Sequence, residues 1–329
     1  NGVGFLRGDL GMKKILIILC ITMAWLNAVE LFSPVHEIKV NGMSKDMVLR
    51  EKELIIGTTN GVLQVYDYEE KVFIKTLTLP EIQDFMGDMI APRVFSVDKI
   101  EEKYLMLSDS GKGGYTNLWI HENGVTTQML DPSDKKAVIK ARFINKDQIL
   151  LGYLSNEAAL FDLTSKEEVY RIQLSESKFS DFALNEAKTQ AVFSCESGVL
   201  NIIDTQTGKI VKVLEGMNVD NVYRVDFKQG IVSGAGQDRR GSLYDVVMGS
   251  ATYIEGDFLI YATGLSPSAK KVAFVMDEKN NISIYSRSSK TKIAELQGQK
   301  STLNNIIFKD ENTLFSSSDD NTVIMWSLK

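Results

Sequence analysis

The chain has 329 residues, of which 44% are hydrophobic and 24% charged, and its formal net charge at pH 7 is −6. This length and composition are typical of a globular protein with a large core. An acidic chain without a basic block is poorly suited to binding nucleic acid or anionic lipid. We therefore expect neither nucleic acid nor a membrane surface among the partners of the mature protein.

The first 28 residues resemble a targeting segment rather than part of a fold. Residues 1–11 do not begin with Met and are interpreted as upstream residues. Residues 12–28 follow the plan of a secretory signal peptide, with the basic pair Lys13-Lys14, an apolar stretch over 15–26 and a cleavage site after Ala28. We therefore expect a periplasmic protein whose mature part, residues 29–329, is a single domain that carries a net charge of −8 after the loss of a net +2.

A membrane anchor and a lipoprotein are the alternative interpretations of this segment. Only fifteen uncharged residues separate Lys14 from Glu30, fewer than the roughly eighteen that a spanning helix needs. Cys20 follows Ile-Ile-Leu, which lacks the small residue that a lipidation site requires before its Cys. Leu26 is large for the third position before a cleavage site, so an uncleaved anchor stays open as the alternative to cleavage.

One short pattern recurs along the rest of the chain with a nearly constant step. An apolar run ends in an aromatic or apolar residue, followed in most copies by Asp or Ser. The final residues of these copies are Asp67, Ile120, Asp162, Asp204, Asp245, Ser286 and Ser327. The steps between them are 53, 42, 42, 41, 41 and 41 residues. A strand pattern that recurs about every 40 to 45 residues has the period of a β-propeller blade. Because the pattern occurs seven times, the sequence predicts an all-β, seven-bladed propeller.

Each repeat contains three short apolar runs separated by polar turns. The clearest copies are the last, with runs at 306–308, 313–317 and 322–326, and the first, with runs at 47–49, 54–57 and 62–67. Asn60-Gly61 between two of these runs is a strong hairpin signal, because both residues tolerate positive φ. A fourth, outer strand is expected at 73–79, 169–174, 210–214 and 292–296.

The last repeat has no fourth strand before the chain ends at Lys329. An unassigned apolar run, residues 35–40, precedes the first repeat. We expect this run to pair with residues 322–326 as the outer strand of the last blade. Such pairing would close the ring through the two ends of the domain and leave no inner edge unpaired.

Residues that carry metal, haem or nucleophilic chemistry form no recognisable pattern. The only His residues, His36 and His121, belong to different parts of the repeat plan. After cleavage one Cys is left, Cys195, which we expect to be a buried hydrophobe in the second strand of repeat four. The Asp-rich turns lack the spacing of a calcium loop. We therefore expect no catalytic residue, no cofactor and no metal ligand.

The first departure from the repeat is an excess of about eleven residues between repeats one and two, at 79–93. It contains four apolar residues at helix-like spacing, Phe85, Met86, Met89 and Ile90. One interpretation is a turn of helix tucked over the mouth of the channel. The other is an exposed docking element, since Met and Phe adapt well to partner grooves.

The second departure is the pair Arg239-Arg240, in the turn between the second and third strands of repeat five. We expect this turn on the same face as the insertion, where the two Arg residues would either pair with a partner's carboxylates or be solvated. Taken together, these residues form one candidate partner-binding surface: Phe85, Met86, Met89, Ile90, Arg239 and Arg240.

The strand ends and the 41 to 42 step resemble the WD40 family over the whole mature chain. The Gly-His dipeptides of that family are absent, and only Trp119 and Trp326 keep its Trp. The His-Asp-Ser-Trp hydrogen-bond tetrad of the family therefore cannot be assumed. The resemblance implies the propeller fold, which rests on the period and the strand order.

The start Met12-Lys13-Lys14-Ile15, the propeller and a composition rich in Lys, Ile and Asn also resemble the L accessory proteins of periplasmic nitrate reductase clusters. This resemblance implies a periplasmic accessory role in nitrate respiration, as a non-catalytic scaffold whose protein partners are reductase subunits. We also expect the protein to be a monomer. Two other hypotheses stay open. One is an enzyme of the lactonase or quinoprotein propeller type, which the scarcity of His disfavours. The other is an envelope assembly factor that binds outer-membrane clients by strand addition.

Overall fold

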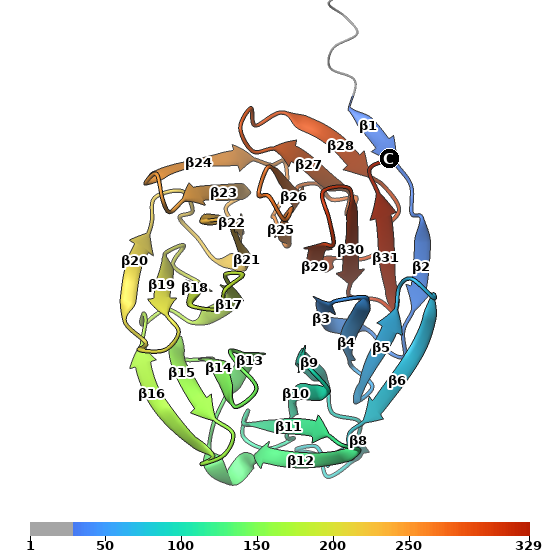
Figure 1. Cartoon of the computed structure of the whole chain (residues 1–329), viewed down its shortest axis with the longest axis vertical. Coiled ribbons are helices and arrows are strands. Elements are labelled where there is room, and N and C mark those ends of the chain that lie inside the picture. The colour runs from blue at the N-terminus through green and yellow to red at the C-terminus, as the bar shows by residue number, and fades with distance from the viewer. Residues whose placement is uncertain (1–28) are drawn as a thin grey trace, which may run out of the picture.

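The computed structural model of the chain describes residues 29–329. Seven β-sheets are arranged as blades around a central channel (Figure 1). The predicted all-β, seven-bladed propeller is confirmed. The expected signal peptide and the residues before it lie outside the described residues. Within residues 29–329, no helix is long and apolar enough to cross a membrane.

Each blade has a core of four antiparallel strands that run in order from the channel to the outside, except that the outer strand of blade 7 comes from the start of the domain. Blades 1 to 3 consist of β3 (Ser44–Arg50), β4 (Glu53–Thr58), β5 (Val62–Asp67) and β6 (Val72–Thr78); β9 (Val94–Ile100), β10 (Lys103–Asp109), β11 (Thr116–Glu122) and β12 (Val125–Leu130); and β13 (Val138–Phe143), β14 (Gln148–Tyr153), β15 (Glu157–Asp162) and β16 (Glu167–Gln173). A 3-10 helix, η1 (Pro132–Asp134), joins blades 2 and 3.

Blades 4 to 7 follow the same order. They consist of β17 (Phe179–Leu184), β18 (Gln190–Cys195), β19 (Leu200–Asp204) and β20 (Ile210–Leu214); β21 (Val222–Lys228), β22 (Ile231–Gly236), β23 (Arg240–Asp245) and β24 (Ser250–Glu255); β25 (Thr263–Leu265), β26 (Lys271–Val275), β27 (Ile282–Ser286) and β28 (Lys292–Leu296); and β29 (Leu303–Phe308), β30 (Thr313–Ser318) and β31 (Thr322–Ser327). Cys195 ends β18 and is buried, as expected.

The ring is closed by the start of the domain. Strand β2 (His36–Lys39) pairs antiparallel with β31, with Ile38 opposite Val323, so the predicted closing strand is confirmed. A second strand, β1 (Glu30–Phe32), was not predicted and pairs in parallel with β28 as a fifth strand of blade 6. Figure 1 shows β1 and β2 in blue beside the red strands of the last two blades.

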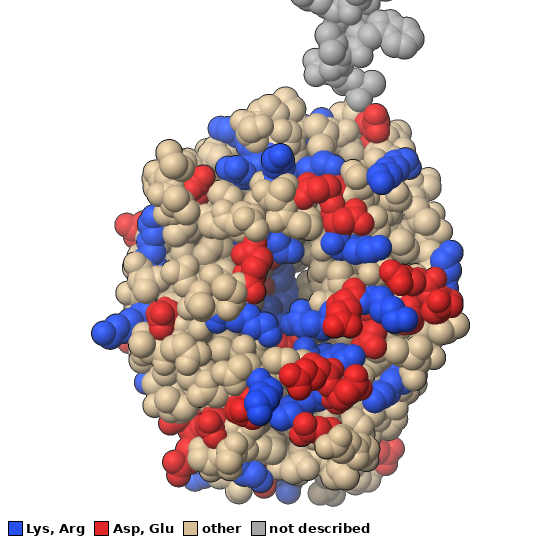
Figure 2. Space-filling view, viewed as in Figure 1, with Lys and Arg blue, Asp and Glu red and all other residues tan. Residues whose placement is uncertain are grey.

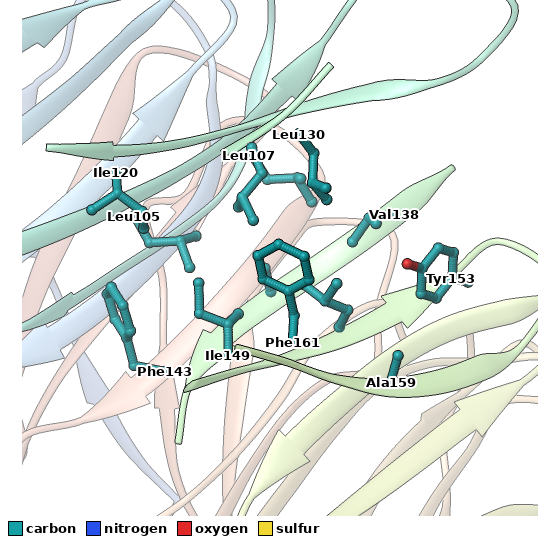
Figure 3. Packing of buried hydrophobic residues seen from close by; sticks show 13 residues of the cluster. Leu105, Leu107, Ile120, Leu130, Val138, Phe143, Ile149, Tyr153, Ala159 and Phe161 are labelled. Carbon is teal, nitrogen blue, oxygen red and sulfur yellow. The ribbon is translucent and has the colours of Figure 1, made fainter. Parts of the chain in front are cut away.

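Apolar runs in the second strand of a blade are continuous because both faces of the strand are buried between blades. Leu105 and Leu107 of β10 pack against Phe143 and Phe161 of blade 3 (Figure 3). Met106, between them in sequence, faces the other way and packs in a cluster with blade 1. Burial of large side chains on both faces of each sheet supplies most of the folding free energy.

Carboxylates on the inner strands clamp neighbouring blades together. Asp46 Oδ2 of blade 1 accepts a hydrogen bond from Val97 N of blade 2 at 2.8 Å. The same contact recurs at 2.9 Å from Phe143 N to Asp98, at 3.1 Å from Val225 N to Asp181 and at 2.8 Å from Leu265 N to Asp226. These buried or half-buried acids therefore have a structural role that the repeat pattern did not reveal.

Candidate functional site

The insertion between blades 1 and 2 is a β-hairpin. Strand β7 (Ile82–Gln83) pairs antiparallel with β8 (Met89–Ile90). The expectation of a helical turn was wrong, because the Asp84 carboxylate accepts hydrogen bonds from Met86 N at 2.8 Å and Asp88 N at 2.9 Å. Gly87 supplies the positive φ of +96° that closes this tight turn.

The four apolar residues of the insertion are all exposed. The exposed fraction is 91% for Phe85, 73% for Met86, 59% for Met89 and 42% for Ile90. Large apolar side chains that gather on one exposed element are typical of interaction sites rather than of ordinary surface. Their exposure agrees with the docking interpretation of the insertion, not with a segment tucked into the channel.

The hairpin is held against blade 2. Gly111, in the turn between β10 and β11, has a φ of +73°, and a Cβ added there would lie 2.1 Å from Gln83 O. Only glycine therefore allows the hairpin backbone to approach this turn so closely. Next to it, Arg93 forms a bidentate pair with Asp109, with Nε to Oδ2 at 2.7 Å and Nη2 to Oδ1 at 3.0 Å. This pair ties the residue before β9 to the end of β10.

The hairpin borders a cavity of about 1040 Å³ at one mouth of the channel, which we call the upper cavity. Phe85, Ile82 and Ile90 line it from the hairpin. Tyr223 and Tyr261 also line it, with their rings stacked at 5.2 Å between centroids. The two Tyr residues belong to blades 5 and 6, so sequence reasoning did not connect them to the insertion. In the sequence, the aromatic residues of the connection at 256–262 were the signal that could have pointed to this part of the site.

The charged groups at the floor of the upper cavity are paired with one another. Lys45 contacts Asp319 at 2.7 Å, and Lys140 contacts Asp181 at 2.5 Å. Burial favours the neutral form of Asp46, but Arg142, 2.9 Å away, keeps the pKa of Asp46 below its usual value. Burial also lowers the pKa of Lys140. The floor therefore offers an ion-paired surface beneath an apolar and aromatic rim.

The two Arg residues of the second departure lie away from this cavity. Arg240 stacks over the Tyr253 ring at 4.6 Å and donates a hydrogen bond to Met217 O at 3.2 Å. Arg239 is exposed, with a φ of +64°. Their blade, which contains β23, lies across the ring from β8 (Figure 1). The structure therefore brings Phe85 and Ile90 to the upper cavity and places Arg239 and Arg240 elsewhere.

A hydrogen-bond chain of the kind expected in WD40 blades is present in blade 7 without His. Trp326 Nε1 donates to Ser316 Oγ at 2.8 Å, and Ser316 Oγ donates to Gln299 Oε1 at 2.7 Å. Gln299 Nε2 then donates to Ser318 Oγ at 2.6 Å. The Gln amide has both an acceptor and a donor, so it completes the chain in place of an imidazole.

The two His residues lie apart. His36 Nε2 is 2.8 Å from Tyr66 Oη, and His121 Nδ1 is 2.8 Å from Thr126 Oγ1. Neither His residue lines the upper cavity. Across residues 29–329, no group of three or more His, Cys, Asp or Glu side chains is arranged to hold a metal ion.

Comparison with known proteins shows the fold and not the function. No model of a known protein family matches the chain, and no curated protein matches it in sequence. Among solved structures, it is similar to the β-propeller domain of Cps50 (Swd1) from Myceliophteria thermophila, with a TM-score of 0.70 and 16% identity. That match covers 91% of this chain and 100% of the other. The chain therefore has the fold of a WD40-type propeller, a fold that serves many unrelated functions.

Proposed function

We propose that this protein is a non-catalytic interaction scaffold that binds a protein partner through the β7–β8 hairpin and the rim of the upper cavity. The observation that carries the proposal is the exposure of Phe85 and Met86 at the tip of a hairpin that is fixed by its own turn and by Gly111. A rigid apolar anchor loses little conformational freedom on binding, which favours affinity.

The partner that fits this surface is a protein segment with apolar side chains. Phe85 and Ile90 on one side, and the stacked Tyr223 and Tyr261, offer apolar and aromatic contacts. The charges below them are already paired, so no net charge selects the partner. Aromatic and Met side chains are enriched at the centres of protein interfaces, where they contribute most of the binding energy.

The absence of catalysis is part of the proposal. Three acids lie at the floor of the upper cavity: Asp46, Asp181 and Asp319. Each forms an ion pair with a neighbouring cation. A general base needs a lone pair that can reach a substrate proton. A propeller enzyme would have to release one of these acids from its partner, and this supports the scaffold over the lactonase and quinoprotein alternatives.

The more specific assignment, to a periplasmic accessory role in nitrate respiration, rests on the sequence resemblance alone. It requires export of the chain and reductase subunits as partners. Identification by mass spectrometry of the proteins that the scaffold captures from periplasmic extract of nitrate-grown cells tests both requirements. Recovery of reductase subunits would support this role, and their absence would contradict it without affecting the fold.

Strand addition on the outer edge of a blade is the second candidate function, and one observation favours it. Strand β1 already adds in parallel to the outer strand of blade 6, with Leu31 opposite Glu295. Strand β20, the outer strand of blade 4, exposes Ile210, Val211 and Val213 along a similar edge. An unpaired edge of this kind is a template for a strand of another chain.

One capture experiment distinguishes the two sites. The variants are Phe85→Ala in the hairpin, Val211→Lys on the β20 edge, and Met248→Ala as a matched control, because Met248 is also exposed but lies in a turn of blade 5. We expect loss of the partner from Phe85→Ala only, with a cost of about 2 kcal/mol or more, as for an interface hot spot. Loss from Val211→Lys only would favour strand addition and overturn the hairpin proposal.

A further inference from the structure

A second cavity, of about 340 Å³, lies farther along the central channel; we call it the lower cavity. Three acidic side chains line it, Asp181, Glu186 and Asp226. Six basic side chains line it as well: Arg50, Lys140, Arg142, Lys188, Arg224 and Lys228. Figure 2 shows the hollow at the centre of the ring with Lys and Arg side chains inside it. This gathering of cations is unexpected in a chain whose net charge is −6.

The acids near this cavity are already occupied by other donors. Asp98 accepts from Arg50 Nη2 at 2.5 Å, from Lys99 N at 2.8 Å and from Phe143 N at 2.9 Å. Asp226 accepts from Phe227 N and Leu265 N, both at 2.8 Å. Because backbone amides take up these lone pairs, the carboxylates satisfy only part of the hydrogen-bonding capacity of the surrounding cations.

Lys188 is the cation with the fewest contacts. Within residues 29–329, its ammonium forms neither a hydrogen bond nor an ion pair, although its side chain lines the lower cavity. Its backbone is fixed, because its own N–H donates to Asn185 O at 3.0 Å and its carbonyl accepts from Thr205 Oγ1 at 2.7 Å. Burial is the main cause that lowers the pKa of Lys188; the nearby carboxylate of Asp98 raises this pKa, and Arg50 and Arg142 lower it. The ammonium thus lies near two guanidinium groups and near the Asp98 carboxylate, which already accepts hydrogen bonds from Arg50, Lys99 N and Phe143 N.

Two other cations that line the lower cavity also have donors to spare. Lys228 Nζ lies 3.9 Å from Asp226, which is too long for a hydrogen bond. Arg50 uses its guanidinium for Lys99 O, Leu49 O and Asp98, which accounts for three of its five N–H groups. Lys188, Arg50 and Lys228 come from blades 4, 1 and 5, so they approach the lower cavity from different sides of the channel.

We propose that the lower cavity is a binding site for a small inorganic oxyanion of the phosphate or sulfate type, held by Lys188, Arg50 and Lys228. Such an anion supplies the acceptors that these donors lack, and charge-assisted hydrogen bonds to oxyanions are among the stronger polar contacts in proteins. Its charge offsets the repulsion between Lys188 and the two Arg residues. Because the three donors belong to different blades, the bound anion also ties the ring together.

The binding is measured by isothermal titration calorimetry with sodium phosphate and with sodium sulfate, at an ionic strength held constant with sodium chloride. Thermal unfolding under the same conditions gives a second readout, because a ligand that binds only the folded state raises the melting temperature. We expect saturable binding of both dianions and a melting temperature that rises with their concentration. No heat and no shift up to about 20 mM anion would overturn the proposal.

Two variants locate the site. Lys188→Gln is compared with Lys166→Gln, a matched control in a turn of blade 3 with a φ of +58°, close to the +56° of Lys188, and an exposed side chain. We expect Lys188→Gln to weaken phosphate binding about tenfold or more, and Lys166→Gln to leave it unchanged. Equal affinities for both variants would contradict the assignment. Lys228→Gln gives an independent test, with the same loss expected and the same conclusion if the loss is absent.

Discussion

The closing strand β2 gives the clearest prediction of stability. Ile38 is only 2% exposed, and it packs with Phe315 of blade 7 and with Met47, Leu54 and Tyr66 of blade 1. Ile38→Ala removes three buried carbon groups, which at about 0.8 kcal/mol each gives about 2.4 kcal/mol of lost transfer free energy. A residual cavity adds to this, so we expect a loss of about 2 to 4 kcal/mol in the free energy of unfolding.

The assay is denaturant unfolding combined with amide hydrogen exchange. Because Ile38 connects the last blade to the first, exchange should accelerate in blades 1 and 7 more than in blade 4. The control is Val35→Ala, three residues earlier and 55% exposed, which should change stability by less than about 0.5 kcal/mol. A loss below about 1 kcal/mol for Ile38→Ala, or a loss equal to that of the control, would refute closure of the ring through β2.

Three further predictions follow from particular contacts. Burial would raise the pKa of Glu168, but hydrogen bonds from Arg171, Lys136 and Tyr153 lower it to about 2. Its folded pKa is thus below the unfolded one, so it should contribute up to about 3 kcal/mol near neutral pH, lost as pH falls from about 5 toward 2. Melting temperatures across this range should fall less steeply for Glu168→Gln than for the parent, and parallel curves would contradict the claim. Trp326→Phe leaves buried Ser316 without its donor and should cost about 1 to 2 kcal/mol in denaturant unfolding. Trp119 donates a longer hydrogen bond, of 3.2 Å, to Ser108 at a half-buried position, so Trp119→Phe should cost less stability than Trp326→Phe. A larger cost for Trp119→Phe would be inconsistent with the hydrogen-bond chain in blade 7. Gly111→Ala should displace the β7–β8 hairpin and speed proteolytic cleavage near Phe85 without global unfolding, whereas an unchanged cleavage rate would show that the hairpin does not depend on Gly111.

The blades could be predicted from sequence because each contains a strand that is buried on both faces. The run Leu105-Met106-Leu107 shows why, since its alternate side chains enter the cores of two different neighbours. Such strands are continuously apolar and recur at the period of the blade, so both the period and the strand order were visible. Strand β5 was predicted residue for residue at 62–67, and the inner strands were predicted too short. The inner strand of blade 7, for example, has polar residues near its start, such as Asn304, which donates to Ser44 O of blade 1 at 2.8 Å.

The candidate site could be predicted only in part. The insertion was visible as a break in the period, but Phe85, Met86, Met89 and Ile90 fit a helical spacing and a short hairpin equally well. The Asp84 carboxylate favours the hairpin, because it accepts backbone hydrogen bonds within a tight turn. This signal comes from a single polar residue and is not contained in the spacing of the apolar residues. The stacked Tyr residues and the basic lining of the lower cavity come from different blades. They meet only when the ring closes, so no single repeat predicts them.

The most direct test of the scaffold function is photo-crosslinking from the hairpin tip. A photoreactive phenylalanine analogue is placed at position 85 in one variant of the protein and at position 248 in a second variant. Position 248 is also exposed but lies in a turn of blade 5. Both are irradiated in cell extract, and the adducts are identified by mass spectrometry. We expect one specific protein adduct from position 85 and none of it from position 248. Adducts of that protein from position 248 only, or no specific adduct from position 85, would contradict partner binding through the hairpin.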